Sequence, residues 1–201
     1  ILLGGLASGM VLFIVSVGLS VTMGLMGFVN LAHGGFAMLG GYVIALSMQH
    51  WGLPFGWALL LGFVAIAALS MVLERLFYSR LYRAAELDQV LFTIGLVFVM
   101  TASVTLGIGP TSQSVVLPDW LRGQTDLGFI QYRTYSLALI ATGTLLMLAL
   151  WLGFERTRFG ARIRAAVDNR RMASSLGVDV GRLFTVTFAI GSGLAAVGGG
   201  L

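Results

Sequence analysis

The sequence predicts an all-α fold, a polytopic bundle of about six membrane-spanning helices. Hydrophobic residues make up 58% of the 201 residues, and charged residues only 10%. A water-soluble domain carries about 25% charged residues, because its surface must face water. The 28 glycines fit the same interpretation, since helices that pack closely in lipid favour small residues at their contacts. We therefore expect most of the outer surface to face lipid.

Six stretches are apolar enough, or nearly so, over the roughly 20 residues that a spanning helix needs. They are residues 2–25, 31–49, 56–77, 89–109, 134–154 and 183–201. The second stretch contains four glycines and begins beside Asn30 and His33, so it is either a full span or a broken, partly re-entrant element. All six runs are too continuously apolar for barrel strands, which alternate over about 10 residues.

Two small-residue patterns predict where helices touch. Gly5-x-x-x-Gly9 lies in the first stretch, and Gly191-x-x-x-Ala195-x-x-x-Gly199 lies in the last. Small side chains at this spacing let two helix backbones approach closely in a membrane. We expect both patterns to form helix–helix contacts.

All twelve basic residues are arginine, and their positions predict an orientation. Ten lie in the connections 74–88 and 155–182, whereas Arg122 and Arg133 lie in or beside the connection 110–133. If all six stretches cross, the first two connections share one side. Basic residues concentrate in cytoplasmic loops, so these two connections are expected to be cytoplasmic and 110–133 external. The same rule accounts for the net charge of +4 without a nucleic-acid partner.

The absence of lysine and cysteine excludes several chemistries. A Walker A phosphate loop and Schiff-base catalysis both require lysine, so the chain itself is not expected to hydrolyse ATP. Without cysteine there is no disulfide framework, thiol nucleophile or cysteine metal site. With only two histidines we expect no metal centre, no cofactor and no catalytic residues.

The chain begins at Ile1 and ends within the apolar run 183–201. We interpret residues 1–201 as a single transmembrane domain of a longer protein, truncated at both ends.

Asn30 and His33 lie three residues apart and would share one face of a helix. Polar side chains in lipid are costly unless they find partners or water. They could line a translocation pathway or hold the bend that shapes it. Alternatively, Asn30 caps the second helix and His33 bonds a neighbouring carbonyl group.

The connection 155–182 carries helix signals of its own. Phe159, Ile163 and Ala166 recur at helical spacing between arginines, and Asp168 or Asn169 could cap a short helix over 170–176. Gly177 followed by an apolar residue fits a glycine C-cap. Two turns are too short to persist alone in water, so this helix must dock on lipid headgroups or in a groove of a partner protein. Its small residues and Asp168 favour the protein partner.

Two stretches resemble the permeases of leucine/isoleucine/valine ABC importers. Residues 27–34 with 38–42, which include Asn30, His33 and Gly34, resemble the signature of the first of the two paired permeases. Residues 155–178 and 187–191 are similar to the cytoplasmic coupling loop of the family and the segment that follows it. Family members continue for roughly two more spans, so this chain alone is not expected to form a closed pathway.

The resemblance implies the partners and the residues that contact them. The partners are a second permease subunit, two cytoplasmic ATP-binding subunits and an extracytoplasmic substrate-binding protein, in a bacterial inner membrane. The positions that carry over as ATPase contacts are Arg164, Ala165, Asp168, Ala173, Leu176 and Gly177. The implied substrate is a branched-chain amino acid, although close relatives carry urea, short amides or other amino acids.

Two alternatives stay open: an ATPase-independent secondary transporter or channel, and a scaffold subunit without a pathway. Ion-coupled transporters usually need acids within the membrane. All eight acidic residues lie in loops or at span edges, so the sequence predicts no buried carboxyl group.

Overall fold

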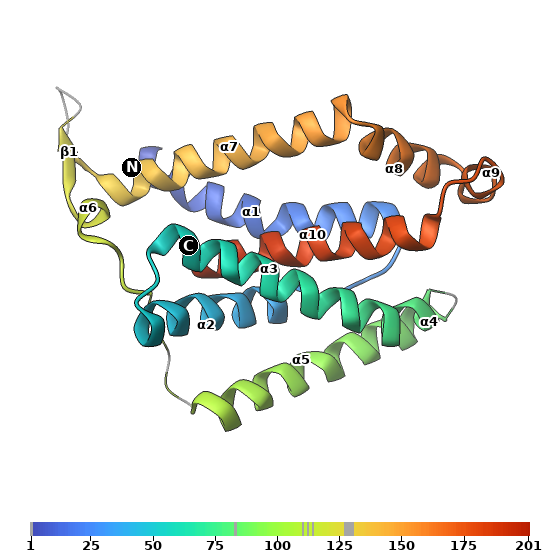
Figure 1. The fold of residues 1–201 in the computed structure, drawn as a ribbon, viewed down its shortest axis with the longest axis horizontal. Coiled ribbons are helices and arrows are strands. Elements are labelled where there is room, and N and C mark those ends of the chain that lie inside the picture. The colour runs from blue at the N-terminus through green and yellow to red at the C-terminus, as the bar shows by residue number, and fades with distance from the viewer. Residues whose placement is uncertain (1, 83, 110, 112, 114, 127–130) are drawn as a thin grey trace.

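The computed structural model describes residues 2–82, 84–109, 111, 113, 115–126 and 131–201, and within them it confirms the all-α prediction. Six long helices run back and forth across the molecule (Figure 1). They are α1 (Leu2–Met26), α2 (His33–Trp51), α3 (Phe55–Leu73), α5 (Glu86–Ile108), α7 (Thr134–Arg156) and α10 (Val180–Gly200). Each predicted stretch therefore corresponds to one long helix.

The third helix continues beyond α3 without leaving its axis. A π-helical turn, η1 (Glu74–Tyr78), and a single α turn, α4 (Ser79–Leu81), extend it to residue 81. Five stretches of the described residues are long and apolar enough to cross a membrane, and this extended helix, Phe55–Leu81, is one of them. The other four are Leu2–Gly24, Glu86–Ile108, Thr134–Arg156 and Val180–Gly200.

The second helix, α2, does not reach the hydropathy of the other five, but it is unbroken from His33 to Trp51. The irregular segment lies before it, at residues 27–32. His33 at the start of α2 contacts the carbonyl of Val15, near the middle of α1, so this segment runs back along α1 into the bundle. Of the two alternatives that the sequence left open, the structure shows a continuous helix with an irregular segment before it.

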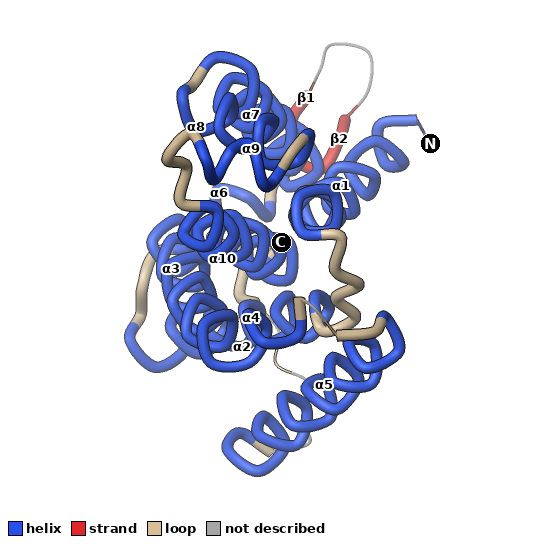
Figure 2. The backbone as a smooth tube through the Cα atoms, turned by 90° about the vertical axis from the view of Figure 1, so that its right-hand side faces the viewer, coloured by secondary structure: helices blue, strands red, loops and turns tan. Residues whose placement is uncertain are grey.

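The last helix, α10, is the centre of the bundle, packed against α1, α2 and α3. Along its most apolar stretch 78% of the residues are buried, compared with 22% or less in the other four candidate spans. Figure 2 shows α5 at the edge of the bundle, where it contacts α2, and α7 on the other side, against α1.

Glycines let α10 approach its neighbours closely. A Cβ atom on Gly18 of α1 would lie 2.3 Å from the carbonyl oxygen of Gly191, and one on Gly40 of α2 would lie 2.2 Å from the Cβ of Ala196. Ala195 is fully buried in the same helix. The pattern Gly191-x-x-x-Ala195-x-x-x-Gly199 thus forms the predicted helix contacts. For Gly5-x-x-x-Gly9 no such contact is formed within the described residues, since no other element lies within 4 Å of a Cβ on either glycine, and the predicted helix contact stays a prediction. Spacing alone does not say which face of α1 is covered.

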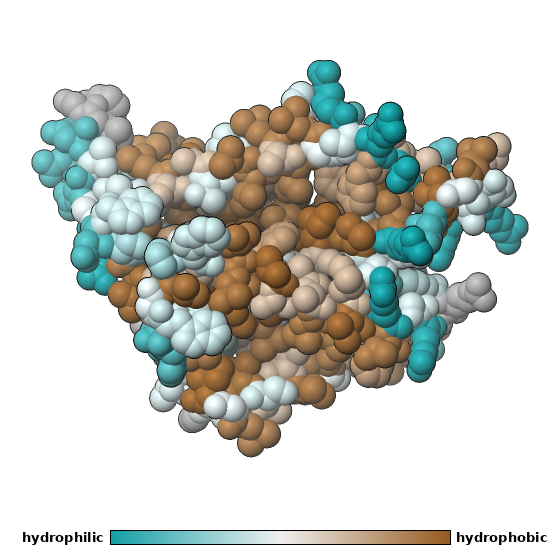
Figure 3. Space-filling model, in the orientation of Figure 1, coloured by the Kyte–Doolittle hydropathy of each residue, from teal (hydrophilic) through white to brown (hydrophobic). Residues whose placement is uncertain are grey.

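The polar residues collect at the two ends of the bundle. One end carries α6 (Asp119–Arg122) and an antiparallel hairpin of β1 (Gln124–Asp126) and β2 (Gln131–Arg133), in which Gln124 lies opposite Arg133. The other end carries α4, α8 (Arg158–Asp168) and α9 (Arg170–Ser175), and we call it the arginine-rich end. Figure 3 shows an apolar middle between two hydrophilic ends, as in a multi-pass membrane protein. Arg83, one of the ten arginines counted in the two basic connections, lies outside the described residues.

The contact between Gly40 and Ala196 makes Gly40→Ala destabilising. Because the added methyl group would overlap the neighbouring helix, we expect the apparent free energy of unfolding to fall by about 1–3 kcal/mol. Thermal unfolding of the purified protein in detergent measures this change. Gly95→Ala is the matched control, since Gly95 is helical and a Cβ there meets no described atom. It should be neutral or stabilising by up to about 1 kcal/mol. Equal losses in both variants would contradict the close contact.

Candidate functional site

The connection at residues 155–182, which we call the coupling loop, folds as two helices, and the first folds back on the end of α7. The Thr157 hydroxyl caps α8 by accepting a hydrogen bond from the Gly160 amide at 3.2 Å. Gly160 lies so close to the Phe154 carbonyl that a Cβ would come within 1.9 Å of its oxygen. Arg164 donates to the same carbonyl and pairs with Glu155 at 3.8 Å. These contacts set the angle between α7 and α8.

The second helix, α9, has the two caps that the sequence predicted. The Asn169 side chain accepts from the Met172 amide at 3.0 Å, which identifies Asn169 rather than Asp168 as the N-cap. At the other end Gly177 has a φ of +83°, its amide donates to Ser174 and the Val178 amide donates to Ala173, both at 3.0 Å. This pair of bonds is the Schellman motif, in which glycine tolerates the left-handed conformation.

A small apolar cluster attaches both helices to the start of α10. Its buried members are Ile163, Ala166, Ala173, Val180, Leu183 and Phe184. The Arg170 guanidinium group lies 4.7 Å from the centre of the Phe184 ring, a cation–π contact between α9 and α10. The coupling loop is thus packed on the helix that forms the centre of the bundle. A displacement of α9 would act directly on α10.

Three large apolar side chains of the coupling loop remain exposed. Val167 is 52% exposed, Met172 63% and Leu176 78%. Met172 and Leu176 are four residues apart, so they lie on one face of α9. Exposed apolar groups among arginines at the end of a membrane protein are typical of a surface that a partner covers.

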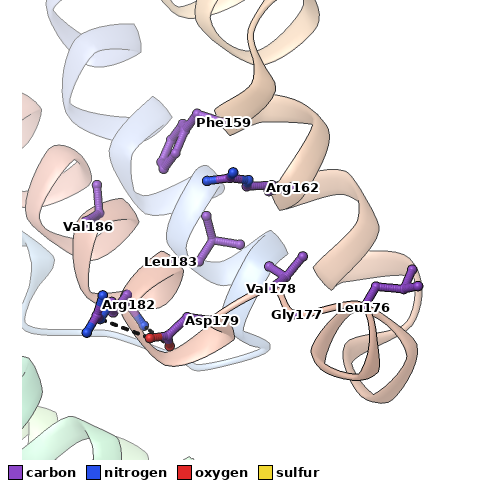
Figure 4. Close-up of a pocket in the computed structure, with 9 residues that line it drawn as sticks. All are labelled: Phe159, Arg162, Leu176, Gly177, Val178, Asp179, Arg182, Leu183 and Val186. Carbon is purple, nitrogen blue, oxygen red and sulfur yellow. Dashed lines mark hydrogen bonds and ion pairs between the residues drawn. The ribbon is translucent and has the colours of Figure 1, made fainter.

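A hollow of about 410 Å³ lies between α8, the end of α9 and α10 (Figure 4). Phe159 and Leu183 contribute apolar walls, while Arg162 and Arg182 flank the opening. Arg182 is paired with Asp179 at 3.0 Å. The hollow therefore combines an apolar lining with the paired Arg182 and with Arg162, which has no ion pair among the described residues, and it borders the exposed Leu176.

The six predicted ATPase-contact positions do not share one environment. Ala165, Asp168, Leu176 and Gly177 are exposed, whereas Ala173 is buried in the apolar cluster. Arg164 bonds the Phe154 carbonyl and pairs with Glu155 at the end of α7, so it positions α8. Whether these residues contact a partner stays a prediction.

The signature residues Asn30 and His33 are both 3% exposed and hold the irregular segment 27–32 in place. Asn30 Oδ1 accepts hydrogen bonds from the Ala32 amide and the Tyr78 hydroxyl, each at 3.1 Å. His33 Nε2 bonds the Val15 carbonyl at 2.9 Å, the kind of contact that the structural interpretation predicted. Asn30 is not the cap of α2, because Ala32 occupies that position. Gly34 follows at an exposed position.

Irregular backbone at membrane depth is tolerated only where protein or a water-filled cavity satisfies it. Asn30 belongs to the irregular segment and satisfies part of its backbone, since its side chain accepts a hydrogen bond from the Ala32 amide. Within the described part of the chain, Asn30 Nδ2 and His33 Nδ1 are buried without a hydrogen-bond partner. These two nitrogens can therefore form further hydrogen bonds beside the irregular segment 27–32.

The sequence prediction that no carboxyl group is buried is wrong. Glu74, at the start of the π turn, is 2% exposed. One of its carboxyl oxygens, Oε1, accepts from the Tyr82 hydroxyl at 2.5 Å, and Oε2 accepts from the Thr185 hydroxyl at 2.7 Å. Burial, and then the hydrogen bond to Glu74, raise the pKa of Tyr82, so the phenol stays protonated and donates. The position of Glu74 at the edge of a predicted span suggested that it is exposed, but the start of α10 covers it.

Comparison with known proteins identifies the family. Residues 1–201 match the family described as "Branched-chain amino acid transport system / permease component". The chain belongs to this permease family. It is 31% identical over 208 residues to the high-affinity branched-chain amino acid transport system permease protein LivH of Escherichia coli (strain K12), covering 97% of this chain and 67% of that protein. It is 25% identical over 207 residues to the corresponding protein BraD of Pseudomonas aeruginosa, with 98% and 67% covered.

A probable branched-chain amino acid transport permease protein LivH of Methanocaldococcus jannaschii is 25% identical over 211 residues, covering 100% of this chain and 65% of that protein. The chain thus spans about two thirds of the length of these permeases. No solved structure matches it. Family membership confirms the resemblance that the signature and the coupling loop predicted.

The polar contacts of Asn30 predict the effect of removing its side chain from this permease. Asn30→Ala leaves the buried Tyr78 hydroxyl and Ala32 amide without their acceptor, so we expect a loss of about 1–3 kcal/mol in stability. Thermal unfolding in detergent measures it. Ser47→Ala is the control, because within the described part of the chain the buried Ser47 hydroxyl bonds only the Ile44 carbonyl of its own helix. A loss in Ser47→Ala as large as in Asn30→Ala would contradict the assigned role.

Proposed function

We propose that the chain is a transmembrane subunit of an ATP-binding cassette importer for branched-chain amino acids in a bacterial inner membrane. The observation that carries the proposal is the coupling loop: two short helices packed on the central helix α10, with exposed apolar side chains at the arginine-rich end. In a member of this permease family, such a loop suits docking on a separate ATP-binding subunit. The arginine-rich end would then be cytoplasmic, because basic residues concentrate in cytoplasmic loops.

The proposal assigns ATP hydrolysis to partner chains. This chain contains no lysine, so it lacks the residue that a Walker A loop requires. The complete importer would contain this chain, a second permease subunit, two cytoplasmic ATP-binding subunits and an extracytoplasmic substrate-binding protein. Leucine, isoleucine and valine are the proposed substrates, with related amino acids, urea and short amides as the alternatives.

The mechanism follows from the attachment of the coupling loop to α10. ATP binding closes the pair of ATP-binding subunits and displaces α9, whose exposed Leu176 and Met172 they hold. Because α9 is packed on α10 through Ala173 and Phe184, α10 shifts with it against α1, α2 and α3. The loop biases the bundle only if its contacts differ between the outward-open and inward-open states. Asn30 and His33 would lie along the pathway, with their unpartnered nitrogens available to substrate or water.

One observation favours a second function, an ATPase-independent secondary transporter. Glu74 is buried inside the candidate span Phe55–Leu81, and ion-coupled transporters usually need an acid within the membrane. Co-purification separates the two functions. A stoichiometric ATP-binding subunit retained with the tagged chain supports the importer, whereas accumulation of substrate by the chain without any such subunit supports the secondary transporter.

The coupling role predicts that Gly177→Pro abolishes ATP-dependent uptake while membrane insertion stays normal. Proline fixes φ near −65° and has no amide hydrogen, so it fits neither the φ of +83° nor the bond to Ser174. Uptake into proteoliposomes of the reconstituted importer measures the effect, with leucine, isoleucine, valine and urea as the panel.

Asp168→Arg tests the same role by charge, and should also abolish uptake. Asp88→Arg is its matched control, because Asp88 is exposed, lies at the start of α5 at the same end, and undergoes the same change of charge. Normal uptake with Gly177→Pro and Asp168→Arg, or equal losses with Asp88→Arg, would count against the coupling loop.

A further inference from the structure

The buried carboxyl group of Glu74 connects two segments that are far apart in the chain. Its partner Thr185 lies on α10, 111 positions further on, and its partner Tyr82 lies just after α4. Both carboxyl oxygens are used, one by each hydroxyl. Glu74 also begins the π turn of the third helix, and single π turns inside α-helices occur frequently at functional sites.

Both partners of Glu74 lead to the coupling loop. Phe184, the neighbour of Thr185, is covered by Arg170 of α9 and meets the Tyr82 ring edge-on at 5.6 Å. A displacement of α9 would therefore move Phe184. It would also move Thr185 and Tyr82, the two residues whose hydroxyl groups donate hydrogen bonds to Glu74. These contacts form a continuous chain from the coupling loop to the π turn.

The far side of the π turn leads to the signature segment. Tyr78, the last residue of the turn, donates to Asn30 and packs its ring on Phe188 of α10 at 4.8 Å. Tyr82 also meets Phe28 edge-on at 6.0 Å. The π turn thus contacts the irregular segment 27–32 directly, through Tyr78 and Asn30. It is linked to the coupling loop indirectly, because Tyr82, a partner of Glu74, meets Phe184, which lies under Arg170.

An acid is a costly choice for this position if packing is its only purpose. Burying a carboxyl group carries a desolvation penalty, and replacement of buried ionic groups by apolar residues is often neutral or stabilising. A carboxyl group has about four lone-pair sites, so it can exchange donors while it stays bonded. That property suits a contact between two helices, here the π turn and α10, that shift relative to each other.

We propose that Glu74 is a positioning residue of the transport cycle. Its hydrogen bonds to Thr185 and Tyr82 tie the π turn to α10, so that movement of the coupling loop reaches the third helix and, through Tyr78, the segment that holds Asn30. This inference rests on the proposed importer function. It adds the route by which the ATP-driven movement reaches the signature residues.

The test compares two buried threonines of α10 in the complete importer reconstituted with its ATP-binding subunits. Thr185→Val removes the bond to Glu74. Thr187→Val is the matched control, because the Thr187 hydroxyl is also buried and, among the described residues, bonds only the Leu183 carbonyl of its own helix. The measurements are ATP hydrolysis and uptake of whichever panel substrate the wild-type importer accumulates, both on the same proteoliposomes.

We expect Thr185→Val to lower uptake about tenfold, the effect of a coupling energy of about 1.4 kcal/mol, while ATP hydrolysis stays within about twofold of wild type. Tyr82→Phe, which removes the other donor, should give the same separation of the two activities. Glu74→Gln keeps one carbonyl acceptor and an amide, so it should retain more uptake than either. Thr187→Val should match wild type in both activities.

Parallel losses of uptake and ATP hydrolysis in Thr185→Val and Tyr82→Phe would overturn the proposal, because a purely structural role predicts them. Equal effects of Thr187→Val and Thr185→Val would overturn it too. Failure of the importer function shows differently, since the wild-type chain would then purify without an ATP-binding subunit. If the wild-type importer couples ATP hydrolysis to uptake and Thr185→Val and Tyr82→Phe also transport normally, the proposed role of Glu74 is rejected. The importer function itself then stands.

Discussion

The bundle depends on the close approach of α10 to α1, α2 and α3. Lipid gives helices no hydrophobic reason to associate, so contact depends on van der Waals packing between backbones that can come near each other. Gly18 and Gly191 supply that approach on the side of α1, and Gly40 with Ala196 on the side of α2. Because α10 contacts three helices at once, its position determines how those three helices are arranged around it. Any element that moves α10 acts on all three.

The coupling loop is built to act on that helix. Its two short helices could not persist alone, yet caps define their ends and a buried cluster attaches them to the first turns of α10. The exposed Met172 and Leu176 face away from this attachment. The loop therefore has an inner side that is packed on α10 and an outer side that is exposed, an arrangement that fits the proposed docking of an ATP-binding subunit.

Several polar groups inside the bundle lie where it departs from regular helix. Asn30 and His33 satisfy the segment before α2, and Glu74 and Tyr78 lie in the π turn of the third helix. The Tyr78 hydroxyl joins these two irregular places directly. Regular helices in lipid satisfy their own backbone groups, whereas irregular backbone needs other partners, and Asn30 is such a partner for the Ala32 amide.

Much of this protein follows from the sequence by itself: the all-α class, the six long helices, the uneven distribution of arginine and the two caps of α9. Each of these depends on composition or on residues within a few positions of one another, such as Asn169 and Met172. Family membership was also visible in the signature and the coupling loop. The tertiary structure alone decided which polar groups are buried and what they contact. Glu74 meets Thr185 across 111 positions, Arg164 turns back to α7, and Gly191 rather than Gly5 lies at a crossing. The physical reason is that burial depends on which helix faces are covered, and hydropathy along one segment carries no information about the segment that covers it.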